Sequence, residues 1–215
     1  MCGFVGYVND TPDKSVNEKI IKDMADRIRH RGPDQDDYYV DSSVSLGFRR
    51  LSIIDLDGGS QPILNEDGTK VLVFNGEIYN YQPIREELIK KGHVFRTKTD
   101  SEVLLHGYEE YGCELLNKLR GMFAFVIWDS TEKKLFGARD IFGIKPFFYY
   151  LKNGNFLFGS EIKSFLSNPL FEKELNEERL PDYLCFEYIP TTETMFKNVY
   201  KMEPGSYFTL SLIHI

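Results

Sequence analysis

The second half of the chain is a succession of short apolar runs separated by turn residues, and this pattern restricts the fold more than any other feature. The runs are MFAFVIWD (122–129), KLFGARD (134–140), PFFYYL (146–151), NFLFGS (155–160) and SYFTL (206–210). Strands that follow one another through short turns pair antiparallel, because a parallel pair needs a long crossover connection. Further strands are predicted at 4–8, 37–41, 44–48 and 71–80.

Helices are predicted between these groups of strands. Ser15-Val-Asn-Glu18 matches a capping box, and the helix that it opens carries one apolar residue per turn: Val16, Ile20, Met24 and Ile28. Other helices are predicted at 81–91, from the capping box Thr99-Asp-Ser-Glu102 to Gly112, and at 114–119, 161–167 and 176–184. No segment rich in proline, glycine or serine divides the chain. We therefore predict one α+β domain in which helices flank two packed sheets.

The charge balance excludes several classes of protein. The 215 residues include 26 Lys and Arg against 33 Asp and Glu, a formal net charge of -7. A nucleic-acid partner is not expected, because neutralising phosphates requires clustered cations. No apolar stretch reaches the length of a membrane span, and the N-terminus lacks the basic and apolar regions of a signal peptide. We expect no membrane partner and a cytoplasmic location.

Cysteine and histidine spacing argues against a metal site or a disulfide framework. The three cysteines, Cys2, Cys113 and Cys185, are an odd number without a close pair. Cys113 and Cys185 are predicted to be small buried apolar residues. The histidines at 30, 93, 106 and 214 are scattered, with no pair at zinc-ligand spacing. We predict that the chain binds no metal.

Cys2 is an unusual residue because it stands directly after the initiator methionine and directly before a predicted strand. Removal of Met1 would leave a thiol and a free α-amine on one residue. An α-amine has a pKa of about 7.7–8.0, so an appreciable fraction is unprotonated near neutral pH and can act as a base. Taken alone, however, Cys2 is better explained as a residue without a function.

Three other polar positions have both a structural and a functional interpretation. Asn75-Gly76 is a strong turn signal that would break the strand at 71–80, but an asparagine amide beside a backbone N–H also suits an oxyanion hole. Arg50 lies in an apolar segment and could be a surface residue or a carboxylate ligand. Asp100 lies at a predicted helix start, where an acid is favourable in any case.

Together these positions belong to a series of motifs that resembles one family in order and spacing. The chain is similar to the class II glutamine amidotransferases, which have an N-terminal nucleophile, and most closely to the glutaminase domain of asparagine synthetase. The matching segments are CGFVGYV, HRGPD (30–34), RRLSIID, QP (61–62), FNGEIYNY (74–81), TKTDSEVLLHGYEEYG (97–112), LRGMFAFVIWD (119–129), GARDIFGIKPFFYY (137–150), FGSEIKSFL (158–166) and YIPTTETMFKNVYKMEPGSYF (188–208). They cover nearly the whole chain.

The resemblance implies a fold and a reaction. The family fold is a four-layer αββα sandwich of two mainly antiparallel sheets, of the Ntn-hydrolase type. By resemblance, Cys2 is the nucleophile and its α-amine the general base, and Asn75 with the N–H of Gly76 stabilises the oxyanion. The implied reaction is hydrolysis of the side-chain amide of glutamine through a glutamyl thioester. A retained Met1 would place the α-amine on the wrong residue.

The resemblance also implies a set of residues that bind glutamine. Arg50 would bind its α-carboxylate, and Asp100 and Glu77 its α-ammonium group. Backbone groups near Leu51 and Ile53 would complete the pocket. The retained set of polar residues favours this enzyme over two alternatives, a catalytically silent domain that binds glutamine and a structural module without a ligand.

The resemblance further sets expectations for partners and domains. Family enzymes continue into a synthetase domain with an SGGxDS-type loop for ATP, and this loop does not occur in the sequence. We expect a glutaminase domain at 1–210 that needs no cofactor, and a truncated linker or foreign tail at 211–215. ATP and Mg²⁺ would serve only the missing domain. The expected partners are glutamine and that domain, and a homodimer is left open. Ile141 stands where the family often has arginine.

Overall fold

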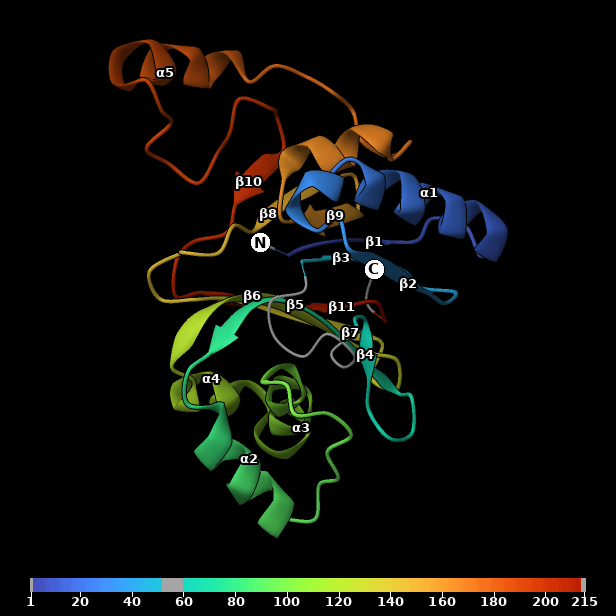
Figure 1. Cartoon of the computed structure of the whole chain (residues 1–215). Helices are drawn as coiled ribbons and strands as arrows, with labels where there is room; N and C mark the ends of the chain where they lie inside the picture. The colour runs from blue at the N-terminus through green and yellow to red at the C-terminus, as the bar shows by residue number, and fades with distance from the viewer. Residues whose placement is uncertain (1, 52–59, 214–215) are drawn as a thin grey trace.

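Two antiparallel sheets face each other in the middle of the molecule (Figure 1). The computed structural model describes residues 2–51 and 60–213. The β1 sheet has six strands, in spatial order β10 (Val199–Lys201), β8 (Phe148–Lys152), β9 (Asn155–Gly159), β1 (Gly3–Val8), β3 (Val44–Arg50) and β2 (Gln35–Val40). The β5 sheet has five: β11 (Tyr207–Ser211), β7 (Lys134–Arg139), β6 (Gly121–Asp129), β5 (Lys70–Ile78) and β4 (Ile63–Leu64).

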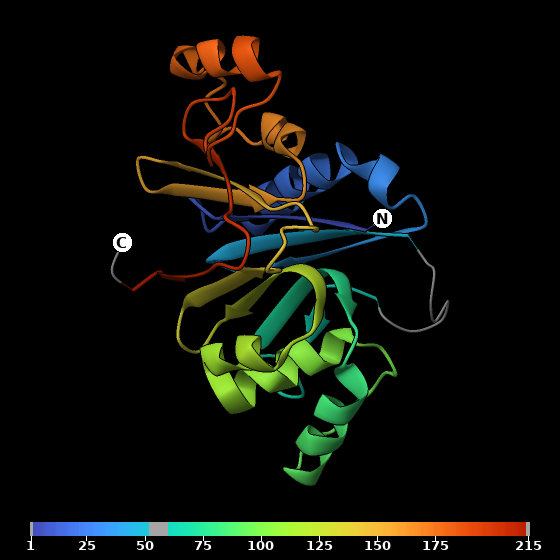
Figure 2. The ribbon, with the colours of Figure 1, turned by 90° about the vertical axis from the view of Figure 1, so that its left-hand side faces the viewer.

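Helices cover the outer face of each sheet. Helix α1 (Lys14–Asp26) and the 3₁₀ helix Ile162–Ser167 lie on the β1 sheet, whereas α2 (Tyr81–Lys90), α3 (Ser101–Tyr111) and α4 (Leu115–Lys118) lie on the side of the β5 sheet (Figures 1 and 2). Helix α5 (Leu180–Phe186) projects away from these layers. Short 3₁₀ helices span Arg29–Arg31, Gly112–Glu114 and Glu177–Arg179. The predicted four-layer αββα sandwich is confirmed.

The alternation of side chains along the strands explains how the layers pack. In β5, Val71 and Val73 point between the two sheets and pack with Trp128, whereas Leu72 and Phe74 point outward to the helices. A third apolar cluster lies between the β1 sheet and α1. Because successive side chains of a strand face opposite ways, each sheet contributes to two of these apolar layers. The same alternation decides which polar side chains reach the space between the sheets.

The predicted break at Asn75-Gly76 is wrong. Strand β5 runs through both residues, and all nine of its residues pair with β6. A Cβ atom on Gly76 would lie 2.3 Å from the carbonyl oxygen of Met122 on β6. The glycine is therefore needed not for a turn but because the backbones of β5 and β6 approach closely here.

Both predicted capping boxes are also wrong. The N-cap of α1 is Asp13, whose carboxylate accepts from the N–H groups of Ser15 at 3.0 Å and Val16 at 3.4 Å. At α3 the Glu102 carboxylate does not reach back to the cap. It accepts instead from the backbone N–H groups of Arg96 at 3.0 Å and Thr97 at 2.8 Å. At α1 another residue therefore caps the helix, and at α3 the glutamate binds N–H groups that precede the helix.

The predicted environments of several apolar residues also need correction. The buried face of α1 is Asn17, Ile21, Met24 and Ala25, and Val16 is 43% exposed. Cys113 and Cys185, predicted to be buried, are both exposed. Cys113 lies in a 3₁₀ turn, and Cys185 lies on α5, none of whose residues is buried.

Among the described residues, no helix is both long and apolar enough to cross a membrane, and the longest, α1, has 13 residues.

Candidate active site

Cys2 lies immediately before β1 and is half-buried at the edge of the space between the sheets. The guanidinium Nε of Arg31 donates to its carbonyl oxygen at 3.0 Å, and Arg31 also contacts Glu161 at 3.1 Å. The backbone N–H of Leu51 donates to the thiol Sγ at 3.4 Å. These contacts hold Cys2 in place, although residues near a chain end are usually frayed.

Asn75 points into the same space between the sheets. It is two residues beyond Val73, which packs between the sheets, so the period of two in β5 places both side chains on the same face. Asn75 is 2% exposed, and its amide nitrogen Nδ2 has no hydrogen-bond partner in the part of the chain that the structure describes. Leaving a buried donor unpaired costs about 1–3 kcal/mol. Such a donor is a candidate for binding a ligand.

Arg50 is the last residue of β3 and is almost completely buried. Its guanidinium Nη1 donates to Oε1 of Gln35 on β2 at 3.3 Å. Gln35 pairs with Arg50 across the two strands, so this contact follows from the strand register. A buried guanidinium at a strand end is a rigidly placed cation that can bind a carboxylate.

Asp100 precedes α3, and its carboxylate Oδ2 accepts from the backbone N–H of Ile78 at 2.7 Å. Burial raises the pKa of the Asp100 carboxyl above its usual value, the hydrogen bond from Ile78 opposes this rise, and the negative charge of Glu77 adds to it. Glu77 itself is exposed. A cation bound beside Asp100 would favour its charged form.

A single cavity of about 380 Å³ contains nearly all the site residues expected from the sequence. Those that line it are Cys2, Arg50, Leu51, Asn75, Gly76, Glu77 and Asp100. Ile53 lies outside the described residues. The volume falls in the range of small-molecule sites, which is about 300–1,000 Å³. The structure thus brings together residues from β3, β5, the start of α3 and the N-terminus.

Other cavity residues were missed by the sequence reasoning, among them Gln61 and Lys145. Gln61 is buried, donates to the carbonyl of Phe74 at 3.0 Å and accepts from its N–H at 2.6 Å, so its side chain binds β5 as a neighbouring strand would. Lys145 is 6% exposed and also lines the cavity. Gln61 lies in the matched segment QP, and Lys145 lies in the matched segment GARDIFGIKPFFYY. Their place in these segments was the only signal in the sequence that could have pointed to them.

The groups in the cavity are those that an amino-acid site with a nucleophile would need. A guanidinium and carboxylates in one cavity suit a ligand that carries both a carboxylate and an ammonium group. A thiol and an amide donor that line the same cavity could together perform acyl transfer, because the thiol can attack a carbonyl carbon and the amide can bind the carbonyl oxygen.

The fold and this cavity define a class of protein, the amidotransferases that carry a cysteine at the N-terminal end of an Ntn-hydrolase-type sandwich. A model of the glutamine amidotransferase domain matches residues 1–213, and the chain belongs to this family.

Relatives found by sequence comparison are named glutamine-hydrolyzing asparagine synthetases. The chain is 49% identical over 214 residues to glutamine-hydrolyzing asparagine synthetase 1 of Bacillus subtilis, covering 98% of this chain and 33% of that protein. It is 40% identical over 166 residues to a probable glutamine-hydrolyzing asparagine synthetase of Dictyostelium discoideum, covering 76% of this chain and 30% of that protein. The chain therefore spans about a third of the length of these curated relatives.

Solved structures support the fold alone. The glutamine phosphoribosylpyrophosphate amidotransferase of Bacillus subtilis is similar with a TM-score of 0.64 at 19% identity, covering 81% of this chain and 45% of that one. A structure described as the allosteric regulatory enzyme of purine biosynthesis has a TM-score of 0.65 at 17% identity, covering 99% of this chain and 47% of that one.

Proposed function

We propose that this domain hydrolyses the side-chain amide of glutamine to glutamate and ammonia, with Cys2 as the nucleophile. The observation that carries the proposal is the buried Asn75 amide donor, which lacks a partner among the described residues and lines the same cavity as the thiol. A donor held unpaired in the protein is ready for the oxygen charge that develops during attack, and it needs no reorganisation at that moment.

The remaining cavity residues would select an α-amino acid. Arg50 would bind the α-carboxylate, and Asp100 with Glu77 would bind the α-ammonium group. The raised pKa of Asp100 supports this role, because a bound ammonium would supply the positive charge that burial otherwise denies to the carboxylate. Backbone groups near Leu51 and Ile53 are expected to complete the glutamine pocket.

The reaction would proceed in two halves. Sγ of Cys2 attacks the side-chain carbonyl carbon, and the α-amine of the same residue takes the thiol proton. The amide of Asn75 and the N–H of Gly76 stabilise the resulting oxyanion. The carbon–nitrogen bond then breaks, the α-ammonium returns a proton to the leaving nitrogen, and ammonia departs. Water hydrolyses the thioester with the α-amine as base, which releases glutamate and restores the thiol.

We propose that the ammonia is used by a second domain. The curated relatives are about three times as long as this chain and are named asparagine synthetases. In the protein to which this domain belongs, an ATP-dependent synthetase domain would consume the ammonia, and ATP with Mg²⁺ would be required only there. The glutaminase half would need no cofactor.

The test is to incubate the Met1-free chain with glutamine alone. We expect equal amounts of glutamate and ammonia, no dependence on ATP, and an acid-quenched intermediate in which the Cys2 peptide is heavier by one glutamyl group. Cys2→Ala is the control and should show none of the three. Saturable glutamine binding without ammonia release by Met1-free protein would instead identify a catalytically silent glutamine-binding domain.

A further inference from the structure

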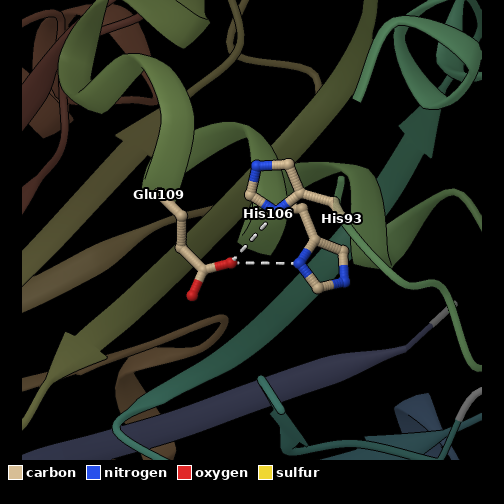
Figure 3. Close-up of side chains that lie close together, drawn as sticks. All are labelled: His93, His106 and Glu109. Carbon is tan, nitrogen blue, oxygen red and sulfur yellow. Dashed lines mark hydrogen bonds and ion pairs between the residues drawn. The ribbon is translucent and has the colours of Figure 1, made fainter. Parts of the chain in front are cut away.

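Two histidines and a glutamate come together on the helical side of the β5 sheet, outside the cavity. His93 lies in the segment after α2, and His106 and Glu109 lie one turn apart on α3. In Figure 3 one carboxylate oxygen of Glu109 faces both imidazole rings. The sequence gave no sign of a metal site here, because the separation of His93 and His106 along the chain does not match a zinc-binding motif. Only the packing of the loop against α3 brings them together.

The distances between the ligand atoms suit a metal ion. Oε2 of Glu109 lies 3.0 Å from Nδ1 of His106 and 3.7 Å from Nδ1 of His93. The three atoms all lie within 4.8 Å of one another. Ligands about 2.0–2.2 Å from a tetrahedral Zn²⁺ are separated by roughly 3.3–3.6 Å, so small adjustments would allow all three to bind one ion.

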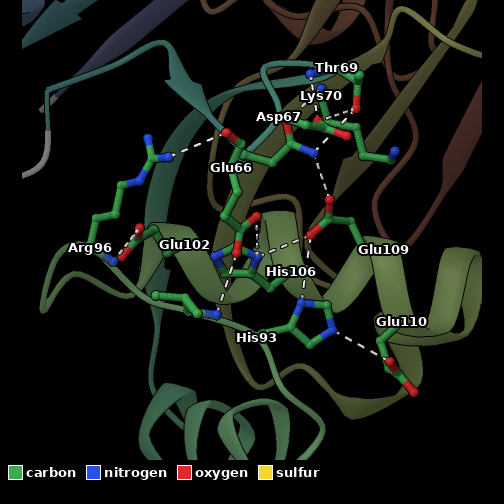
Figure 4. Close-up of polar contacts among 12 residues, drawn as sticks. Glu66, Asp67, Thr69, Lys70, His93, Arg96, Glu102, His106, Glu109 and Glu110 are labelled. Carbon is green, nitrogen blue, oxygen red and sulfur yellow. Dashed lines mark hydrogen bonds and ion pairs between the residues drawn. The ribbon is translucent and has the colours of Figure 1, made fainter.

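The hydrogen-bond partners of His93 and Glu109 are also of the kind that support metal ligands. Nε2 of His93, the nitrogen that faces away from Glu109, lies 3.4 Å from Oε2 of Glu110. The amide of Asn65 donates to the other oxygen of Glu109 at 2.7 Å. A metal-binding histidine usually donates its second ring N–H to a carboxylate, and a metal-binding carboxylate is usually held by a hydrogen bond of its own. Figure 4 shows the contact between His93 and Glu110.

A fourth ligand is within reach. Oε2 of Glu66, in the turn between β4 and β5, lies 3.8 Å from Nδ1 of His106 (Figure 4). His106 is 2% exposed and packs edge-on against the ring of Phe95, with 4.7 Å between ring centroids. The set thus offers two imidazoles and two carboxylates beside an apolar wall. Imidazole nitrogen with carboxylate oxygen is a donor set that suits Zn²⁺ among the divalent ions.

We propose that His93, His106 and Glu109 bind one Zn²⁺ ion, with Glu66 as the fourth ligand. The ion would join three segments that no disulfide connects: the loop after α2, helix α3, and the turn between β4 and β5. The site is structural rather than catalytic, because none of its ligands lines the cavity. It does not depend on the proposed function.

The test measures Zn²⁺ binding directly. The chain without an affinity tag is stripped of metal with a chelator and titrated with Zn²⁺ in a calorimeter. We expect one ion per chain and a higher melting temperature with Zn²⁺. Glu109→Gln and His93→Asn, both only half-buried, should each weaken binding by more than tenfold, and Glu110→Gln by about tenfold. His30→Gln is the matched control, since His30 also contacts a carboxylate, Glu161, at 2.8 Å, and should bind Zn²⁺ normally.

Co²⁺ provides a second measurement that identifies the ligands. Bound to this site it should show the visible absorption of a tetrahedral nitrogen and oxygen complex, without the near-ultraviolet band of a thiolate ligand. A thiolate band would assign the ion to Cys2, Cys113 or Cys185 and overturn the proposal. So would the absence of Zn²⁺ binding by the metal-free chain, or equal affinity in Glu109→Gln, which would leave a histidine–carboxylate hydrogen-bond network as the role of the cluster.

Discussion

Helix α3 has a different polar environment near each of its ends. At its start, Asp100 and Ser101 line the cavity, whereas His106 and Glu109 belong to the histidine–glutamate cluster further along. The cavity combines cationic donors with carboxylates and contains a donor, Nδ2 of Asn75, that is unpaired among the described residues. The cluster gathers imidazole nitrogens and carboxylate oxygens, both of which are common metal ligands.

This difference teaches which kind of ligand each region can bind. A site with groups of both charge signs complements a zwitterion such as an amino acid, because each end of the ligand finds its opposite. A site of imidazole nitrogens and carboxylate oxygens complements a metal cation, because the lone pairs of these atoms can bind the ion directly. Substitutions in the cavity should therefore change turnover and leave Zn²⁺ affinity unaltered, and substitutions in the cluster should do the reverse.

The largest effect expected in the cavity comes from the N-terminus. Protein that retains Met1 should be folded but inactive, because the nitrogen of Cys2 is then an amide without useful basicity. Cys2→Ala in processed protein should lower kcat by a factor on the order of 10⁶, the loss seen when a protease nucleophile is removed. On one sample, intact mass reports whether Met1 is present, and ammonia release reports the rate of glutamine turnover. Turnover by protein that is fully Met1-bearing would refute the mechanism, whereas Zn²⁺ affinity should be equal in all three forms.

Asn75→Ala should have the next largest effect. It removes a donor that acts mainly in the transition state, so kcat should fall about 10²–10³-fold while KM for glutamine changes little. Steady-state kinetics separate the two parameters. A variant with a raised KM and normal kcat would show that Asn75 binds the ground state, and a loss of Zn²⁺ affinity would show that the two regions are not independent.

Arg50→Ala should raise KM more than it lowers kcat. A hydrogen bond to a charged group contributes about 1.5–3 kcal/mol, which corresponds to roughly a 10- to 100-fold rise in KM. Arg50→Lys keeps the charge without the two-pronged geometry and should recover part of the loss. Because Arg50 is buried, the melting temperature of each variant must be compared first. Unchanged KM and kcat in a folded Arg50→Ala protein would remove this residue from the site.

Asp100→Asn should have the smallest effect, and the size of that effect depends on pH. The folded-state pKa of Asp100 is raised above 3.8, so the carboxyl destabilises the ligand-free fold once the pH exceeds the unfolded-state value. Asp100→Asn should therefore raise the melting temperature at pH 7, and the difference should shrink as the pH falls toward 3.8. Thermal unfolding without glutamine checks this.

Asp13→Asn is the control of opposite sign for this measurement. The pKa of Asp13 is lowered, mainly by the hydrogen bond from the Ser15 hydroxyl, so its stabilising effect is present at neutral pH and is lost in acid. This substitution should lower the melting temperature at pH 7. If Asp100→Asn also lowered it at pH 7, the carboxylate would have a stabilising partner in the free protein.

The sequence alone determined most of the strands, the two-sheet architecture and most of the cavity, but it did not predict the short strands β4 and β10. Alternation of side chains is a local property, since it follows from the period of two in an extended backbone. The turn predicted at Asn75-Gly76 interrupted it, and only the continuous strand β5 places Asn75 on the same face as Val73. The motif residues could be assigned to one site because Cys2, Arg50 and Asp100 match the family pattern in order and spacing. The structure places all three in one cavity.

Only the tertiary structure decided features that depend on competing partners. Asn75-Gly76 could have formed a turn, but pairing along the whole of β5 with β6 satisfies the backbone groups that a turn would have left open. Glu102 could have capped α3, but its carboxylate accepts from the N–H groups of Arg96 and Thr97 instead. His93 and His106 acquired a shared carboxylate because the loop after α2 folds back on α3. In each case the outcome depends on which group a segment meets in space, and spacing along one chain does not contain that information.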